Sequence, residues 1–396
     1  MRLFSNRVAG LLAGAVMLTL AGASQAKSAK PVPPPLPEEE IRVEKLSPPD
    51  GYRLYISDPA FAHMVDGRLH IVDGKSMKFM GMIGTGFSAQ TVPSPDGKTI
   101  YVATTYQRHL VRAPREDVLE IHDAATLELK DEIPLPPHHA QAIPYRGMMA
   151  TSTDGSQLYI QGASPATSVM IVDLERKKLL NEVATPGCWA IYPWAGGSAA
   201  SHRISTLCGD GTMLTLEVDE AGQVKSRNRS ARFFNPDKDP LFTHSDFRGD
   251  DRYFVSFGGD VYTVKLAGDA PSFAPVWSLL DKGDRKQGWG PGGYEMTAVH
   301  RASGTLFVAL HPKSYDGSHK NPAKEIWAYD LETHKRIARI PSSGTVAISV
   351  SQGADARLYT LNIEKRSIEA RAIKHGYPSL GVVDQVGDTP MIFEVK

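Results

Sequence analysis

The sequence lacks most of the residue patterns by which a self-contained active site is recognised. It has only two cysteines and no C-x-x-C pair, so zinc-ribbon and thioredoxin-like chemistry has no support. It contains neither a G-x-S-x-G turn nor an H-E-x-x-H helix. Its 44 basic and 44 acidic residues cancel, so no global charge attracts the chain to nucleic acid or to an anionic membrane.

The remaining candidate motifs fail on their chemistry. His138 and His139 are adjacent, so on a strand they point to opposite faces and cannot easily share a metal ion. Residues 288–293 match G-x-G-x-x-G, but they follow a charged stretch, and Pro291 has no N–H to offer a phosphate. A tight Gly-Pro loop is the better interpretation. We therefore assign no catalytic, cofactor-binding or metal-binding residue to this chain from its motifs.

Long apolar runs are also scarce, and one stands out. Arg2 and Arg7 precede an apolar run at 8–20, and small residues end the segment at Ser24 and Ala26. This pattern predicts a signal peptide at 1–26 and export to the periplasm. The alternative is a membrane anchor, but the run is shorter than the roughly 20 residues that span a bilayer. Residues 27–50 are rich in proline and acidic residues, which predicts an extended arm.

What the sequence does contain is a repeat. Apolar runs ending in aspartate recur at Asp73, Asp123, Asp173 and Asp330, and the first three are 50 residues apart. A period of that size indicates repeated β-sheet blades. Asp-Gly pairs, which suit tight turns, precede further β-type runs at 96–97, 154–155 and 210–211. Because these aspartates recur with the repeat, we interpret them as turn caps rather than as catalytic acids.

The repeat predicts an all-β fold, a seven-bladed β-propeller over residues 51–396. At about 45–50 residues a blade, this length holds seven or eight blades, and we choose seven. One short helix is expected within 277–286. A large β-sandwich or two separate β domains are the alternatives.

An oxidising compartment favours a disulfide between Cys188 and Cys208, worth roughly 3 kcal/mol, over two buried free thiols.

Four motifs occur in an order that resembles a known family. They are the segment 81–87 (GMIGTGF), Cys188 with Cys208 followed by Gly-Asp-Gly, the segment 288–294 (GWGPGGY), and His319-Lys320 ahead of 326–330. Together they look like the heavy subunit of the quinoprotein amine dehydrogenases, which include methylamine dehydrogenase and aromatic amine dehydrogenase. The resemblance runs from about Tyr52 to the C-terminus.

This resemblance implies a periplasmic propeller in an α2β2 heterotetramer. In that family a light subunit carries the tryptophan tryptophylquinone cofactor, made from two of its own tryptophans. A primary amine forms a Schiff base with the quinone and leaves as aldehyde and ammonia, and electrons pass to a blue-copper protein such as amicyanin or azurin. The five tryptophans of this chain (189, 194, 277, 289 and 327) are then ordinary packing residues.

Two residue assignments follow from the resemblance. Phe87 matches a heavy-chain phenylalanine that lines the substrate channel to the quinone, although a Phe of the blade core is an equal alternative. Cys188 and Cys208 match a heavy-chain disulfide. Ser88-Ala-Gln90, which follows Phe87, departs from the pattern of methylamine enzymes and points toward the aromatic type.

We therefore expect a non-catalytic heavy subunit of an amine dehydrogenase, one that supports the quinone subunit and lines its substrate channel. Two other functions fit a propeller. One is a self-sufficient enzyme, such as a lactonase or a pyrroloquinoline-type dehydrogenase. The other is a YVTN-like interaction scaffold.

Overall fold

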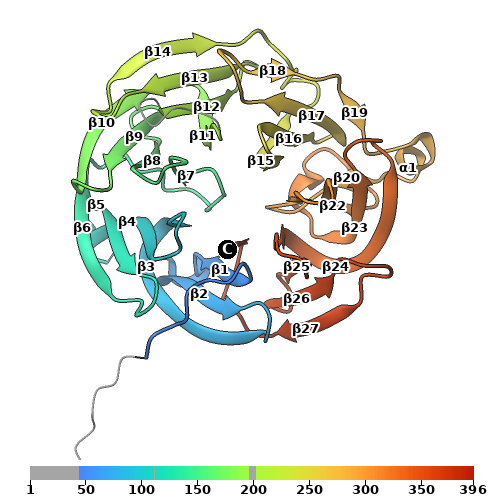
Figure 1. Cartoon of the computed structure of the whole chain (residues 1–396), viewed down its shortest axis with the longest axis horizontal. Coiled ribbons are helices and arrows are strands. Elements are labelled where there is room, and N and C mark those ends of the chain that lie inside the picture. Colours follow the sequence, from blue (N-terminus) through green and yellow to red (C-terminus); the bar gives the residue numbers. More distant parts are fainter. Residues whose placement is uncertain (1–43, 111, 196–201) are drawn as a thin grey trace, which may run out of the picture. The chain divides into compact units, whose positions relative to one another are not determined.

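In the computed structural model, which describes residues 44–110, 112–195 and 202–396, antiparallel sheets surround a central axis (Figure 1). The prediction of an all-β propeller fold is confirmed. Within the described residues the one α-helix is α1 (Lys282–Lys286), which lies in the segment where a short helix was expected. No helix in this part of the chain is long and apolar enough to cross a membrane.

The strands follow one another around the axis in five hydrogen-bonded sheets. The first contains β28 (Ile392–Val395), β1 (Arg53–Asp58), β2 (Gly67–Asp73), β3 (Lys78–Pro93), β4 (Thr99–His109), β5 (Arg112–Asp123) and β6 (Leu129–Leu135). The second contains β7 (Met149–Thr151), β8 (Gln157–Gly162), β9 (Ser168–Asp173) and β10 (Lys178–Ala184), and the third β11 (Cys188–Pro193), β12 (His202–Cys208), β13 (Met213–Val218) and β14 (Val224–Arg229).

The fourth sheet contains β15 (Leu241–Arg248), β16 (Asp251–Ser256), β17 (Asp260–Lys265), β18 (Ser272–Phe273) and β19 (Trp277–Ser278). The last contains β20 (Gly290–Pro291), β21 (Thr297–His300), β22 (Thr305–His311), β23 (Ala323–Asp330), β24 (Arg336–Val350), β25 (Arg357–Asn362), β26 (Ser367–Ala372) and β27 (Ser379–Val383). Two 3₁₀ helices, η1 (Phe61–Asp66) and η2 (Ser318–Lys320), lie in connections.

Two long strands join neighbouring parts of the ring. β3 pairs with β2 through its first half and with β4 through its second half. β24 is shared in the same way between β23 and β25. Because hydrogen bonding continues through these strands, the sheets do not separate into individual blades there, and the count of seven stays a prediction.

The ring is closed by pairing its two ends. β28 pairs with β1, with Leu54 opposite Val395. The buried Asp58, at the end of β1, accepts backbone N–H bonds from Asp388 at 2.6 Å and Thr389 at 2.8 Å. Burial alone would raise the pKa of Asp58, but hydrogen bonds from His70 and these amides hold it at about 2. Asp58 therefore fixes the segment that leads into the closing strand.

The recurrent aspartates have the structural role expected of them. Asp73, Asp123, Asp173 and Asp330 each end a strand, and each side chain accepts a backbone N–H two or three residues ahead. In the Asp-Gly turns the glycines adopt the left-handed conformation, for example Gly97 at φ 69°. Such caps satisfy the backbone where a strand reverses.

The core lies between the sheets. β9 and β22 are buried along their whole length, because a central strand of a sheet with neighbours on both faces has no solvent side. Residues 44–50, from the predicted arm, form no helix or strand, and the N–H of Leu46 donates to the carbonyl of Ala125 at 2.8 Å. The predicted signal peptide at 1–26 lies outside the described residues, as does most of the arm.

Candidate functional site

A hollow of about 310 Å³ lies beside Phe87, and none of the described residues that line it is charged. Its walls come from η1, β3, β4 and the turn after β4, and the lining residues are Val65, Phe87, Thr105, Tyr106, Gln107 and Leu110. Phe87 is half-buried and belongs to none of the packed apolar clusters between the sheets. The structure therefore places the Phe87 ring in the wall of a hollow.

An irregularity in β3 directs Phe87. The pairing of β3 with β4 shifts register between Phe87 and Gln90, and such a bulge re-aims the side chains around it. Gly86 and Ser88, on either side of Phe87, have φ of 66° and 53°. A Cβ on Gly86 would lie 2.9 Å from the Tyr106 ring, so glycine lets β3 approach that ring closely.

Tyr106 forms a second wall of the hollow and is fixed by a buried chain of polar groups. Its hydroxyl donates to Glu120 Oε1, and Glu120 Oε2 lies 3.0 Å from His122 Nε2. Burial and the neighbouring Glu120 carboxylate raise the pKa of Tyr106, so the phenol stays protonated. Glu120 and His122 lie inside an aspartate-ended run and were not among the residues expected to form a site. Their spacing of two residues could have predicted that they lie together, since it places both side chains on one face of a strand.

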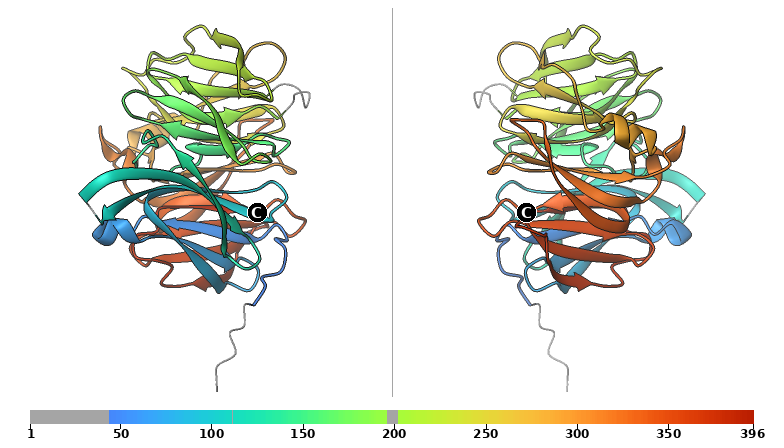
Figure 2. Two further views of the ribbon diagram at one scale, coloured as in Figure 1. Left: turned by 90° about the vertical axis from the view of Figure 1, so that its left-hand side faces the viewer. Right: turned by 90° about the vertical axis from the view of Figure 1, so that its right-hand side faces the viewer.

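Exposed apolar side chains lie on the elements that line this hollow. Phe61 is 39% exposed, Met64 38%, Tyr106 40% and Leu110 72%. Single exposed apolar residues are common, whereas several around one hollow are typical of a protein interaction site. Figure 2 shows η1 and the hairpin of β4 and β5 projecting from the same side of the ring.

The other residues singled out in the sequence have structural roles. Cys188 and Cys208, opposite each other on β11 and β12, form a buried disulfide. In the 288–293 loop Trp289 packs against the buried Trp327 with ring centroids 5.0 Å apart. A Cβ on Gly290 would lie 2.7 Å or less from Ser314 side-chain atoms, so this glycine serves close packing.

The histidines are not gathered. His138 Nδ1 lies 2.8 Å from Glu182 Oε2, and burial lowers the pKa of His139 to about 4. Across 44–110, 112–195 and 202–396, no three His, Cys, Asp or Glu side chains are grouped so as to hold a metal ion.

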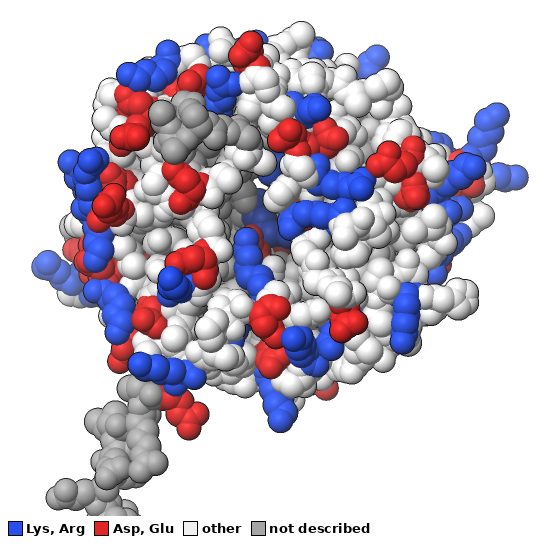
Figure 3. All heavy atoms as spheres, viewed as in Figure 1, with Lys and Arg blue, Asp and Glu red and all other residues white. Residues whose placement is uncertain are grey.

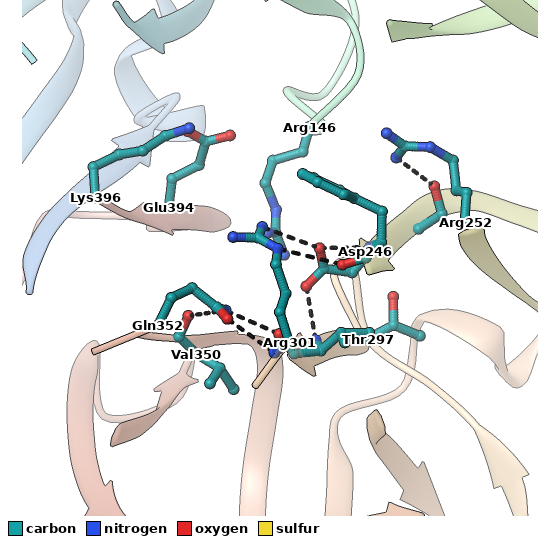
Figure 4. A network of polar contacts seen from close by, with 12 residues as sticks. Arg146, Asp246, Arg252, Thr297, Arg301, Val350, Gln352, Glu394 and Lys396 are labelled. Atoms are coloured by element: carbon teal, nitrogen blue, oxygen red, sulfur yellow. Dashed lines mark hydrogen bonds and ion pairs between the residues drawn. The ribbon is translucent and has the colours of Figure 1, made fainter. Parts of the chain in front are cut away.

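A second and larger cavity, of about 420 Å³, lies at the axis of the ring, and we call it the axial pocket. Figure 3 shows basic side chains around the hollow at the centre of this face, and Figure 4 shows the polar groups within it. Its charged lining residues are Arg146, Asp246, Asp250, Arg252, Arg301, Glu394 and Lys396. Figure 2 shows the C-terminal end of the chain toward the side opposite η1, and the C-terminal residues Val395 and Lys396 line this pocket.

One buried ion pair at the axis ties distant parts of the ring together. Arg146, in the connection before β7, places Nε 2.9 Å from Oε2 of the fully buried Glu295, and its backbone N–H donates to Oε1. Its Nη2 also donates to the carbonyl of Ile348 at 3.2 Å. Burial raises the pKa of Glu295 to about 7, against the opposing effect of the Arg146 charge.

Comparisons with known proteins identify the family. The methylamine dehydrogenase heavy chain (MADH) family matches residues 50–395. The methylamine dehydrogenase heavy chain of Methylobacillus flagellatus is 27% identical over 89% of this chain and 87% of that protein. The heavy chain of Methylophilus methylotrophus is 26% identical over 90% and 86%, respectively.

Among solved structures, the β-propeller domain of Myceliophteria thermophila Cps50 (Swd1) superposes with a TM-score of 0.53. The alignment covers 81% of this chain and 93% of that one at 10% sequence identity, so it bears on the fold alone. The family match, in contrast, covers nearly all of the described residues and agrees with the order of motifs in the sequence. The chain belongs to the methylamine dehydrogenase heavy-chain family.

Proposed function

We propose that this chain is the heavy subunit of a periplasmic amine dehydrogenase that converts primary amines to aldehyde and ammonia. In this proposal the chain performs no chemistry itself. It supports a light subunit that carries the tryptophan tryptophylquinone cofactor, and it lines the substrate channel of that subunit. The observation that carries the proposal is the uncharged hollow at Phe87, with exposed apolar side chains on the elements that line it, in a member of the MADH heavy-chain family.

The light subunit would dock on η1 and on the turn between β4 and β5. Phe61, Met64 and Leu110 lie exposed there, and covering them would gain roughly 25 cal/mol for each Å² removed from water. Docking would also close the hollow, leaving the rings of Phe87 and Tyr106 as apolar walls. Such walls exclude water from the channel and limit the size of the amine that enters.

The packing of the tryptophans supports a quinone on the partner. Trp327 is fully buried, and its Nε1 donates to Glu325 at 2.6 Å. Trp289, packed against it, is 9% exposed, and neither indole lines the hollow beside Phe87. When bound through the light subunit, the quinone supplies the electron sink for amine oxidation. The family resemblance supports an α2β2 assembly and a blue-copper acceptor such as amicyanin or azurin.

The test of this proposal compares the purified chain alone with the chain assembled with a light subunit. The purified chain alone should neither oxidise amines nor absorb as a quinone. Coexpressed with a light subunit and its maturation proteins, it should copurify with that subunit in equal amounts and show dye-linked amine oxidation. Amine oxidation by the chain without any light subunit would overturn the proposal.

A further inference from the structure

The axial pocket, which has no role in the proposed amine oxidation, contains a guanidinium without an acidic partner. Arg252, on β16, donates from Nη1 to Ser245 Oγ at 3.2 Å. Its Nε atom is buried and has no hydrogen-bond partner among the described residues, where Arg252 also forms no ion pair with a carboxylate. Buried charges in proteins are normally paired, so this arrangement is incomplete.

Like charges lie close to Arg252. The guanidinium carbon of Arg252 is 5.2 Å from the centre of the Phe247 ring, and that of Arg301 is 4.3 Å from the same ring. Arg146 lines the same pocket (Figure 4). Burial lowers the pKa of Arg252; Tyr192 and the Asp246 carboxylate oppose this effect, and the Arg301 and Arg146 charges add to it. An anion in contact with Arg252 would offset this cost of burial.

The carboxylates of the pocket are mostly engaged elsewhere. Asp246 accepts the backbone N–H of Val299 at 2.7 Å and that of Phe247 at 2.8 Å, and it forms an ion pair with Arg301 at 3.9 Å. Glu394 lies 3.8 Å from Lys396. Asp250, in the turn between β15 and β16, has no ion-pair partner among the described residues, so its charge opposes an incoming anion most directly.

The wall also contains apolar side chains from several sheets, namely Val92, Met149, Ile191, Leu266 and Val350, beside polar ones such as Ser245 and Gln352. A volume of about 420 Å³ lies within the range of pockets that enclose small molecules. Guanidinium groups match the planar geometry of a carboxylate and bind both of its oxygens. The pocket thus combines a carboxylate-binding edge with an apolar wall.

We propose that the axial pocket binds a small organic monocarboxylate whose carboxylate contacts Arg252 and whose apolar body packs against the apolar side chains of the wall. This site is separate from the hollow at Phe87. The proposal can therefore be tested independently of the proposed amine oxidation.

The experiment measures binding to the full chain, together with its light subunit where the two copurify. Benzoate is titrated calorimetrically, with benzamide as the neutral molecule of the same shape and sulfate as an anion without an apolar body. Benzoate should bind saturably, and benzamide and sulfate should each bind at least about tenfold more weakly, a difference of roughly 1.4 kcal/mol. Equal binding of benzoate and benzamide, or of benzoate and sulfate, would overturn the proposal, as would no binding of benzoate.

Variants locate the site. Arg252→Gln should weaken benzoate binding at least about tenfold, and Arg301→Gln should weaken it less because Arg301 is paired with Asp246. Asp250→Asn should strengthen binding two- to threefold because it removes an opposing charge. Arg203→Gln is the matched control, since Arg203 also lies over an aromatic ring, 5.5 Å from Trp194, but pairs with Glu217 outside the pocket. Benzoate affinity that is unchanged in both pocket arginine variants would contradict the assignment. The Asp250 variant tests it even if an arginine variant fails to fold.

Discussion

The hollow at Phe87 and the axial pocket are of similar size, about 310 and about 420 Å³, but their walls differ in kind. The six residues that line the first include no charged side chain, and its rim exposes Phe61, Met64 and Leu110. The second has charged residues from β15, β16 and β28 around it. An apolar hollow gains most when a protein surface covers it, whereas fixed charges select a small ligand by its charge.

The two cavities also rest on different parts of the fold. The Phe87 hollow depends on a local bulge in β3 and on the neighbouring hairpin. The axial pocket gathers residues far apart in the sequence, and Glu394 and Lys396 reach it through the segment that closes the ring. A change at one cavity should therefore leave the other intact, and the following predictions test this separation.

The largest effect is expected at the rim of the Phe87 hollow. Leu110→Glu places a charge in the surface that the light subunit would cover, and association should weaken about 100-fold, equivalent to roughly 3 kcal/mol. Leu110 is 72% exposed, so the Tm of the isolated chain should not change. Coexpression followed by affinity copurification measures the loss.

Leu380→Glu is the control for this prediction. Leu380 is 46% exposed on β27, away from the hollow, so its variant should keep the light subunit. Full retention of the light subunit by Leu110→Glu would place the docking surface elsewhere.

The next effect concerns ring closure. Asp58→Ala removes the carboxylate that holds the N–H groups of Asp388 and Thr389, and the free energy of unfolding should fall by about 2 kcal/mol. Because the folded-state pKa of Asp58 is about 2, below its ordinary 3.8, its contribution is present above about pH 4. That contribution is lost as the pH falls toward 2, so the variant and the parent chain should converge in acid.

Denaturant unfolding at neutral and acidic pH measures this difference. Asp96→Asn, which alters an exposed turn cap of the same type, should cost much less. Benzoate binding at the axial pocket should weaken in Asp58→Ala, because Glu394 and Lys396 reach that pocket through the closing strand. Unchanged stability at neutral pH would contradict this role of Asp58.

The turns of the fold could be predicted from the sequence, whereas the contacts that build the two cavities could not, because those contacts join residues far apart in the chain. Asp123 and Asp330 act within two or three residues of themselves, so a repeat in the sequence is enough to assign their turns. Arg146 and Glu295 are 149 residues apart, and no local pattern brings them together. Phe87 was identified by a family motif, but its place in a hollow depends on the pairing shift of β3 with β4.

A smaller effect is expected in substrate preference. Phe87→Ala removes one apolar wall, and in the assembled enzyme the ratio of kcat/KM for benzylamine over methylamine should change about tenfold, toward the larger amine. Phe79→Ala is the control, because Phe79 lies on the same strand and is 56% exposed but does not line the hollow. An unchanged ratio in Phe87→Ala would contradict a role for Phe87 in the channel.

The smallest effect separates the ring of Tyr106 from its hydroxyl. Tyr106→Phe keeps the wall but loses the hydrogen bond to Glu120, so stability should fall by about 1 kcal/mol and the amine ratio should change less than twofold. Tyr106→Ala removes the wall and should alter the ratio as Phe87→Ala does. If the Phe variant changed substrate preference as much as the Ala variant, the hydroxyl itself would contact the amine, and the Tyr106 ring would not act only as an apolar wall.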